Sequence, residues 1–386
     1  MNKVRLGIIG LGNIGRYHAA YLLDGKVDRC ELVAVCDAFE KATEPYQAKG
    51  LKTFTDGEEF IKSGEVDAVI VATPHFQHTT LGIAALQAGV HVMVEKPISA
   101  HKADAERLIA ESKKHPKVVF GGMFQMRSEP RYQKIKKLID NNELGTLLRL
   151  NWIDTDWFRS DAYYSSSAWR ATWKGEGGGV TINQCLHQLD TLAWLFGMPK
   201  SVRGFAQLGR FHNIEVEDNV TAYMEYADGA SAIFISSTGE IPGTNRLEIT
   251  GTRGRVVLEK DKLTFIRNEV ASDEWNKTST TGFGQPDQWT IDIPFGNADM
   301  PHAAYIQNFV DAILDGAPLK VPGEEGIRSI ELANVIIYSS LVGQTVELPL
   351  DSKAWEDKLN ELGEKSTLEK KVVEATKEDF TKSFRR

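Results

Sequence analysis

Short apolar runs alternate with helical patterns along residues 1–120. The apolar runs are expected to form strands at residues 4–9, 31–36, 68–72 and 90–95, and the amphipathic segments to form helices at 13–24 and 77–88. Strands that are covered on both faces are apolar along their whole length. The pattern therefore predicts an α/β region with a doubly wound parallel sheet.

The pattern changes near residue 125. Helices are expected at residues 131–143 and 324–342, and the strand-like segments between them alternate in polarity. Two such segments, 220–226 and 230–236, flank Asp228-Gly229, which is a hairpin turn signal. Further strands are expected at residues 247–250, 255–259 and 262–266. This second region is predicted to be α+β, with an antiparallel sheet that is covered on one face.

Composition narrows the classes of function. The 386 residues carry a formal charge of −8, so the chain is not expected to bind nucleic acid, which requires clustered Lys and Arg. The three cysteines, Cys30, Cys36 and Cys185, have no metal-like spacing and fit a reducing compartment. No apolar run approaches the roughly 20 residues of a membrane helix, and residues 4–11 are too short for a signal peptide. We expect a cytoplasmic protein without a membrane partner.

Residues 351–386 differ again, because half of them are charged. Nine acidic and nine basic side chains cancel, and apolar residues are scattered among them: Trp355, Leu359, Leu362, Leu368, Val372, Phe380 and Phe384. We expect a helical tail that packs on its own subunit or on a neighbour; a dedicated partner-binding tail is the alternative.

A glycine motif lies between the first strand and the first helix. Gly10-Leu11-Gly12-Asn13-Ile14-Gly15 fits G-x-G-x-x-G, and Asp37 ends the second strand. The glycines permit a tight turn, the approach of a pyrophosphate to the backbone and close packing of helix on sheet. The pyrophosphate would lie at the helix N-terminus. A carboxylate at Asp37 accepts hydrogen bonds from a ribose diol and repels a 2′-phosphate, so NAD is predicted over NADP. A glycine turn without a cofactor is the alternative.

Two further segments follow strands at the edge where such sheets bind ligands. Thr73, Pro74, His75 and His78 follow one strand, and Glu95 and Lys96 end another. His75 and His78 lack a third metal ligand, so no metal site is predicted and a loop facing the cofactor is preferred. Lys96 is placed to stabilise a developing alkoxide, although a surface lysine at a strand end is a common alternative.

Three glycines, residues 177–179, precede a segment that is predicted to be helical over 180–190. Ile182, Leu186, Leu189 and Ala193 would form its buried stripe. Asn183 and His187 are then at positions i and i+4 and project from one face. His187 suits a general base near neutral pH, whereas an isolated histidine is more often structural.

Aromatic and basic side chains gather between residues 152 and 173, which hold four of the eight tryptophans. Flat aromatic faces beside hydrogen-bonding groups suit a sugar ring. Core packing and a subunit interface are the alternatives. The candidates for ring recognition are Arg127, Trp157, Tyr164, Arg170 and Trp173.

Taken in order, these segments resemble the glucose–fructose oxidoreductase/inositol dehydrogenase/MocA (Gfo/Idh/MocA) family over residues 1 to about 350. The marks are the glycine motif, Thr73-Pro74 with His78, Glu95-Lys96-Pro97, Arg127, the three glycines, and His187 with Asp190. The resemblance implies a Rossmann domain, here 1–125, and a domain with a large open antiparallel sheet, here 126–350. It also implies sugar or cyclitol substrates, a tightly held nicotinamide cofactor, and dimers or tetramers built through the sheets.

By the same resemblance, Lys96 and His187 are expected to be catalytic. Asn183 lies where many members have Asp, and an amide cannot take a proton, so its expected role is to orient substrate or His187. The expected reaction is reversible hydride transfer between a ring secondary alcohol and NAD, with His187 as base and Lys96 on the same oxygen. Two rivals remain: a glycosidase that retains NAD, and a non-catalytic sensor of sugar and nucleotide.

Overall fold

The computed structural model describes residues 2–296 and 300–373. Its first sheet has six parallel strands in the order β3-β2-β1-β4-β5-β6. The strands are β1 Val4–Ile9, β2 Cys30–Cys36, β3 Lys52–Phe54, β4 Ala68–Val71, β5 His91–Val94 and β6 Phe120–Gly122. This is the predicted doubly wound parallel sheet. Its apolar runs are buried, as in β4, where all four side chains are inaccessible to water.

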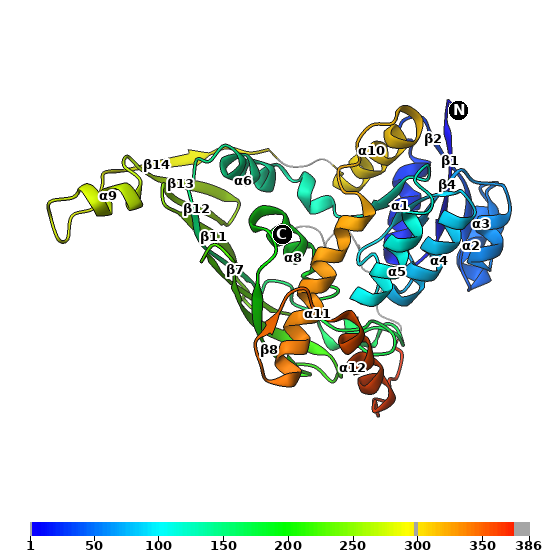
Figure 1. The fold of residues 1–386 in the computed structure, drawn as a ribbon. Coiled ribbons are helices and arrows are strands. Elements are labelled where there is room, and N and C mark those ends of the chain that lie inside the picture. Colours follow the sequence, from blue (N-terminus) through cyan, green and yellow to red (C-terminus); the bar gives the residue numbers. More distant parts are fainter. Residues whose placement is uncertain (1, 297–299, 374–386) are drawn as a thin grey trace.

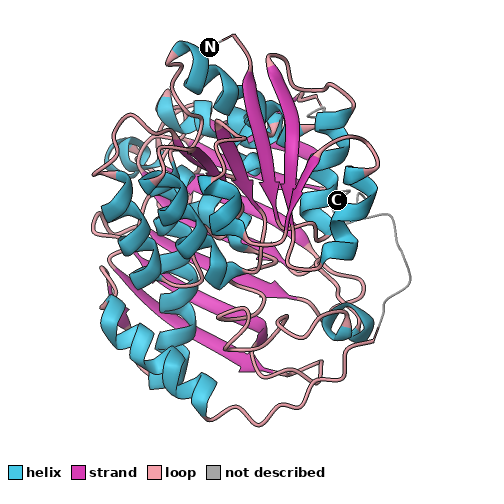
Figure 2. Cartoon of the chain, turned by 90° about the vertical axis from the view of Figure 1, so that its right-hand side faces the viewer, coloured by secondary structure: helices cyan, strands magenta, loops and turns pink. Residues whose placement is uncertain are grey.

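The helices that connect these strands lie beside the sheet (Figures 1 and 2). They are α1 Asn13–Leu23, α2 Glu40–Gln47, α3 Gly57–Lys62, α4 His75–Gln87 and α5 Lys102–Ser112. Helix α4 begins two residues earlier than predicted, directly after Pro74, which is restricted to an extended conformation here. The carboxyl ends of β1, β4 and β5 therefore lead directly into the glycine motif, His75 and Lys96.

The second sheet has nine strands in the order β14-β13-β12-β11-β7-β10-β9-β8-β15. They are β7 Leu147–Asp154, β8 Ser201–Leu208, β9 Glu217–Glu225, β10 Ser231–Ser237, β11 Asn245–Gly251, β12 Gly254–Glu259, β13 Lys262–Asn268, β14 Gln288–Ile293 and β15 Val346–Glu347. The predicted hairpin at Asp228-Gly229 joins β9 to β10. The sheet is mixed, however, because β7 lies between β10 and β11 and runs parallel to β10.

Helices cover one face of this sheet (Figure 1). They include α6 Pro130–Asp140, α8 Leu186–Phe196 and α11 Ile327–Val342, and α11 contacts both β8 and α8. The other face is open and exposes apolar side chains, among them Phe205, Tyr223 and Ile233. The short helices α7 Asp161–Ser165 and α9 Ser272–Thr278 and the 3-10 turn η1 Gln125–Ser128 lie in connections.

The chain returns to the first sheet after residue 300. Helix α10 Pro301–Asp315 contacts α1 and β1, the 3-10 turn η2 Gly323–Gly326 contacts β6, and α12 Ser352–Glu364 contacts α5. Trp355 of α12 is completely buried, so this part of the tail packs on its own subunit. Residues 365–373 follow without helix, and Phe380 and Phe384 lie outside the described residues. The divisions at 125 and 350 stay predictions, since the contacts cross them.

The helix predicted over 180–190 begins later than expected, because α8 extends from Leu186 to Phe196. Glu217 binds the preceding segment instead: its carboxylate accepts hydrogen bonds from the backbone amides of Gly179 and Thr181 at 2.9 and 3.0 Å. Asn183 therefore lies in a turn before the helix, and the i, i+4 argument for it and His187 was wrong. Ile182, Leu186, Leu189 and Ala193 are nevertheless all buried.

Candidate functional site

The glycine motif forms a turn that suits a dinucleotide. Gly10 has a φ of +96°, and a Cβ there would lie 2.6 Å from the carbonyl oxygen of Ala72. A Cβ on Gly15 would lie 1.8 Å from the carbonyl oxygen of Gly10, so the helix can only approach the turn with glycine at this position. Gly12 begins α1 without a side-chain cap and faces open space. The free amides that follow, at Asn13 and Ile14, can bind a pyrophosphate.

Asp37 lies beside this turn at the end of β2. Its Oδ2 accepts a hydrogen bond from the amide of Leu11 at 2.7 Å, and its Oδ1 accepts one from Phe39 at 2.9 Å. These contacts orient the carboxylate and leave a lone pair on each oxygen for a ribose diol.

The ends of β4 and β5 are joined by His78. Its ring nitrogens lie 2.6 and 2.7 Å from the carbonyl oxygens of Pro97 and Thr73. The hydroxyl of Thr73 is buried and has no hydrogen-bond partner among the described residues, as expected of a group that awaits a ligand. The residues present thus fit a nicotinamide dinucleotide. Within residues 2–296 and 300–373, no three His, Cys, Asp or Glu side chains are grouped to hold a metal ion.

Glu95 is a buried carboxylate behind Lys96. His18 contacts its Oε1 at 2.7 Å, and the His18 ring also contacts the hydroxyl of Tyr21. Burial raises the pKa of Glu95, but the hydrogen bond from His18 and the nearby His302 outweigh it, and the pKa falls to about 2. The charged form of the Glu95 carboxylate is therefore favoured at the end of β5, next to Lys96.

Lys96 and Asn183 meet between the two sheets. The Nζ of Lys96 donates to the backbone carbonyl of Asn183 at 2.8 Å and lies 3.5 Å from its Oδ1. Burial lowers the pKa of Lys96, while Glu95 and Glu176 raise it in part. The ammonium thus remains able to donate to a substrate oxygen.

His187 lies in the first turn of α8. Its Nε2 is 3.2 Å from the side-chain amide nitrogen (Nε2) of Gln125. Its Nδ1 has no hydrogen-bond partner in the part of the chain that the structure describes. Burial and the charge of Lys96 lower its pKa well below 6.5. A neutral imidazole beside a lysine ammonium can accept a proton from an alcohol whose oxygen the lysine holds.

Glu176 belongs to this group, although the sequence reasoning did not name it. Its carboxylate accepts hydrogen bonds from the Asn183 side-chain amide and from the backbone amide of Ala171, and its backbone carbonyl accepts one from His75 at 3.0 Å. Only 1% of its surface is exposed. The one available signal was an acidic residue directly before three glycines.

The aromatic segment divides into two sets. Trp157, Arg170 and Tyr163 are half-buried; Arg170 donates to the Tyr163 hydroxyl at 2.5 Å and stacks over the Tyr163 and Trp169 rings. Trp169 contacts His75 edge-on, which links this set to the cofactor side. Tyr164 and Trp173, by contrast, are 4% and 3% exposed, and Tyr164 donates to or accepts from Thr238. Trp169 and Arg170 thus lie near His75 and Glu176, Trp157 donates to Asp154 at 2.7 Å, and the second set belongs to the core.

Arg127 is also buried. Its guanidinium donates to both oxygens of Asp190, at 2.7 and 2.6 Å, and to Glu325 at 2.6 Å. Burial opposes its charge, but Asp190 and Glu325 outweigh burial and raise the pKa of Arg127. These contacts occupy the side chain that had been expected to contact the sugar ring.

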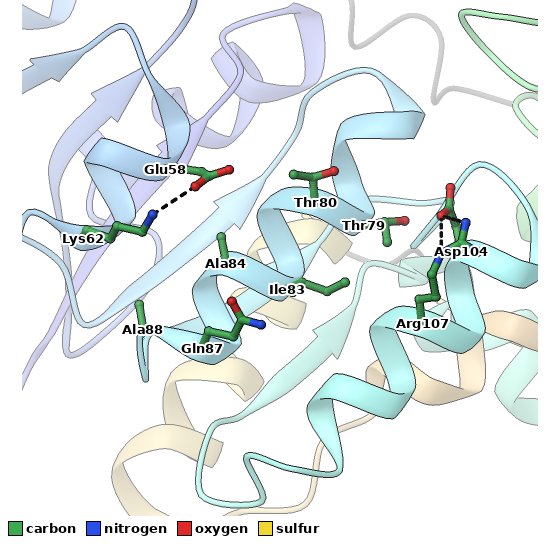
Figure 3. A pocket seen from close by; sticks show the side chains of 10 residues that line it. All are labelled: Glu58, Lys62, Thr79, Thr80, Ile83, Ala84, Gln87, Ala88, Asp104 and Arg107. Atoms are coloured by element: carbon green, nitrogen blue, oxygen red, sulfur yellow. Dashed lines mark hydrogen bonds and ion pairs between the residues drawn. The ribbon is translucent and has the colours of Figure 1, made fainter.

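A shallow hollow of about 590 Å³ lies elsewhere, among α3, α4 and α5 (Figure 3). Its charged side chains pair with one another, Lys62 with Glu58 and Arg107 with Asp104. It contains none of the predicted site residues and is not assigned a role.

Sequence comparison agrees with this geometry. A model described as "Oxidoreductase family, NAD-binding Rossmann fold" (GFO_IDH_MocA) matches residues 4–123, and the "GFO/IDH/MocA C-terminal domain" matches residues 132–257. The chain belongs to the Gfo/Idh/MocA family. It is therefore an oxidoreductase with NAD as its cofactor, as the glycine motif and Asp37 predicted.

Relatives of this family member cover most of its length. Myo-inositol 2-dehydrogenase of Thermotoga maritima is 26% identical over 349 residues, which are 85% of this chain and 94% of the relative. Inositol 2-dehydrogenase of Rhizobium meliloti is 28% identical over 87% of this chain and 96% of its own. The WlbA dehydrogenase of Bordetella pertussis, crystallised with NADH and UDP-GlcNAcA, superposes with a TM-score of 0.76 at 26% identity, covering 90% of this chain and 100% of its own.

Proposed function

We propose that this oxidoreductase moves a hydride between NAD and a ring secondary alcohol of a sugar, an anhydrosugar or a cyclitol. The observation that supports the proposal is the position of Lys96 directly after β5, where its Nζ donates to the backbone carbonyl of Asn183 in the turn that leads into α8 and His187, and where its charge lowers the pKa of His187. Alcohol oxidation requires a base for the hydroxyl proton and a donor for the developing alkoxide, and a neutral histidine and a lysine ammonium can supply these two groups. The inositol dehydrogenases among the relatives and the UDP-sugar acid bound to a neighbour support a polyhydroxylated ring.

The proposed roles follow from the contacts. Lys96 donates to the hydroxyl oxygen and stabilises the negative charge that develops on it. His187 accepts the hydroxyl proton on Nε2 or Nδ1 and is held neutral by burial. Bound NAD⁺ supplies the acceptor for the hydride from the ring carbon. Asn183 orients Lys96, while Trp157 and Arg170 are proposed to contact the ring, since both remain half-buried.

We propose that Arg127, Tyr164 and Trp173 do not contact the sugar ring, in contrast to the expectation from the sequence. The two carboxylate partners of Arg127 and the low exposure of Tyr164 and Trp173 support a role in holding the site together. Assembly through the open sheet also stays a prediction, and it would bury Phe205, Tyr223 and Ile233. Cytoplasmic residence stays a prediction as well. No helix within the described ranges is long and apolar enough to cross a bilayer.

The deciding experiment is to follow absorbance of reduced nicotinamide with NAD⁺ or NADP⁺ and a panel of sugars, anhydrosugars, glycosides and cyclitols. Net NADH formation with a ring alcohol is the expected result. Consumption of a glycoside without a change in cofactor would favour the NAD-retaining glycosidase. Binding of nucleotide and sugar with no turnover of either would favour the sensor.

Cofactor choice should depend on Asp37. We expect Asp37→Ser to raise the KM for NAD⁺ about 10- to 100-fold, the usual cost of losing a hydrogen bond to a charged group, and to improve use of NADP⁺. Steady-state kinetics with both cofactors measure this. Asp24→Ser, at the exposed far end of α1, is the control and should leave both constants unchanged. An unchanged ratio of NAD⁺ to NADP⁺ in Asp37→Ser would contradict the assignment.

The pH dependence of kcat/KM should be bounded by His187 and Lys96. The pKa of His187 is lowered below 6.5, so the base remains neutral and active down to pH values under 6.5. The pKa of Lys96 is lowered from 10.5, so activity should be lost on the alkaline side below pH 10.5 as the ammonium deprotonates. An acid limb centred above pH 6.5 in the wild-type enzyme would exclude His187 as the base.

A further inference from the structure

Asn183 has an uncharged side-chain amide, but this amide contacts the buried carboxylate of Glu176. Glu176 precedes the three glycines, and Gly177 takes a φ of +83°, so the backbone turns sharply after the glutamate. The turn brings the Glu176 side chain onto Asn183, seven residues ahead in the sequence. Burial of a carboxylate is costly unless its oxygens are satisfied, so each contact of Glu176 is informative.

Both oxygens of Glu176 are occupied. Oε1 accepts from the Nδ2 of Asn183, and Oε2 accepts from the backbone amide of Ala171 at 2.5 Å. The guanidinium of Arg170 lies 4.0 Å from Oε1. Since Nδ2 of Asn183 is the donor, the Oδ1 of the same amide must point the other way, and it lies 3.5 Å from the Nζ of Lys96.

We propose that Glu176 is a positioning residue for Lys96: through Asn183 it orients the amide oxygen toward the ammonium and supplies the negative charge that Asn183 lacks. The proposal rests on the proposed function, in which Lys96 holds the substrate oxygen. The two residues then share the functions of one carboxylate: Asn183 provides the hydrogen-bond acceptor, and Glu176 provides the negative charge.

The charges around this pair are mixed. Glu95 and Glu176 favour the ammonium form of Lys96, whereas burial, Arg170 and Arg159 oppose it. Glu176 itself faces Arg170 and Lys370, and His75 contacts only its backbone carbonyl. Burial raises the pKa of Glu176, and Arg170, Ala171 and Asn183 counteract this rise. Removing the charge of Glu176 should therefore lower the pKa of Lys96.

The competing interpretation is that Glu176 is only structural and anchors Ala171. A charge-swap series separates the two. In Glu176→Gln the amide oxygen still accepts from Asn183, but the charge is lost. In Asn183→Asp alone two carboxylates face each other. In the double variant Glu176→Gln/Asn183→Asp the glutamine amide can donate to the new carboxylate, which restores the charge next to Lys96.

We expect Glu176→Gln to lower kcat about 10- to 100-fold, with the KM for NAD⁺ unchanged. Its alkaline limb should move to lower pH, because the pKa of Lys96 falls. The double variant should recover most of kcat and return the limb toward that of the wild type. A merely structural glutamate predicts no such recovery, because the contact to Ala171 stays altered in both variants.

A second readout does not depend on turnover. The pKa of Lys96 can be measured by NMR after reductive ¹³C-dimethylation of the folded protein, with Lys96→Arg used to assign its signal. It should fall in Glu176→Gln and rise again in the double variant. Glu215→Gln is the matched control: one carboxylate oxygen of Glu215 accepts a hydrogen bond from the backbone amide of Trp173 at 2.8 Å, and the other accepts one from the hydroxyl of Ser366.

The outcomes are distinguishable. If no alcohol is oxidised by the wild type but the Lys96 pKa responds as expected, the proposed function fails and the coupling stands. If the Lys96 pKa is the same in the wild type and in folded Glu176→Gln, or if Glu215→Gln shifts it equally, the positioning role is overturned. If Glu176→Gln does not fold, Glu176→Asp provides the test: its shorter side chain keeps the charge but loses the reach to Asn183, and an unaltered kcat would overturn the proposal.

Discussion

Replacing Lys96 with alanine should lower kcat for alcohol oxidation by about 10²- to 10³-fold, the cost of removing one donor from a developing oxyanion. The Nζ of Lys96 lies 2.8 Å from the carbonyl of Asn183, so the ammonium is held at a defined point beside the strand ends. The substitution removes no contact of the glycine motif. Affinity for NADH, followed by quenching of protein fluorescence, should therefore stay close to that of the wild type.

Lys113→Ala provides the control, because this lysine is exposed at the C-terminal end of α5. It should leave both kcat and NADH affinity unchanged. Near-normal turnover in Lys96→Ala would remove the lysine from the mechanism. Loss of NADH binding together with turnover would show instead that the lysine holds the cofactor.

Replacing Arg127 with alanine should lower the free energy of unfolding by about 3–5 kcal/mol, the usual cost of leaving a buried charge without its partner. Asp190 is completely buried and would lose both of its hydrogen bonds to the guanidinium. The pairs of Arg127 with Asp190 and Glu325 connect η1 to α8 and η2, so the loss should loosen the junction of the two sheets. Denaturant unfolding followed by circular dichroism measures the change.

The control for this prediction is Arg131→Ala, since Arg131 pairs with Glu129 and with the exposed Asp261. This substitution should lower the free energy of unfolding much less than Arg127→Ala, because water screens a partly exposed ion pair. If Arg127→Ala unfolded at the wild-type denaturant concentration but raised the KM for the sugar, the original expectation that Arg127 contacts the ring would be restored.

The cofactor half of the molecule could be predicted from the sequence because its signals are local. The central strands of the first sheet are mostly apolar, as in β4, and β1 is followed by a turn whose conformation depends on glycine at position 10. The carboxyl ends of parallel strands meet at one edge, so Lys96 could be placed beside the glycine motif without coordinates. The glycine motif predicted the dinucleotide, and Asp37, directly after β2, predicted NAD over NADP.

The substrate half was predicted less well, because its contacts join residues that are distant along the chain. The parallel pairing of β7 with β10 depends on which strands are neighbours, and alternating polarity does not encode that. Helix α8 begins only at Leu186, and the turn before it is held by a residue distant in sequence: Glu217, from β9, accepts hydrogen bonds from the amides of Gly179 and Thr181. The helical spacing of apolar residues in 180–190 correctly predicted which side chains are buried, but it placed the start of the helix too early.

The sequence by itself determined the class of fold and the cofactor, and it supplied the candidates for the catalytic residues. Only the tertiary structure decided how those residues are paired: Arg127 with Asp190 and Glu325, and Asn183 with Glu176 and Lys96. The physical reason is that hydrogen bonds and ion pairs of buried charged groups depend on distances of a few ångströms between separate elements. Local propensities set the elements, whereas packing of the two sheets brings the charged groups together.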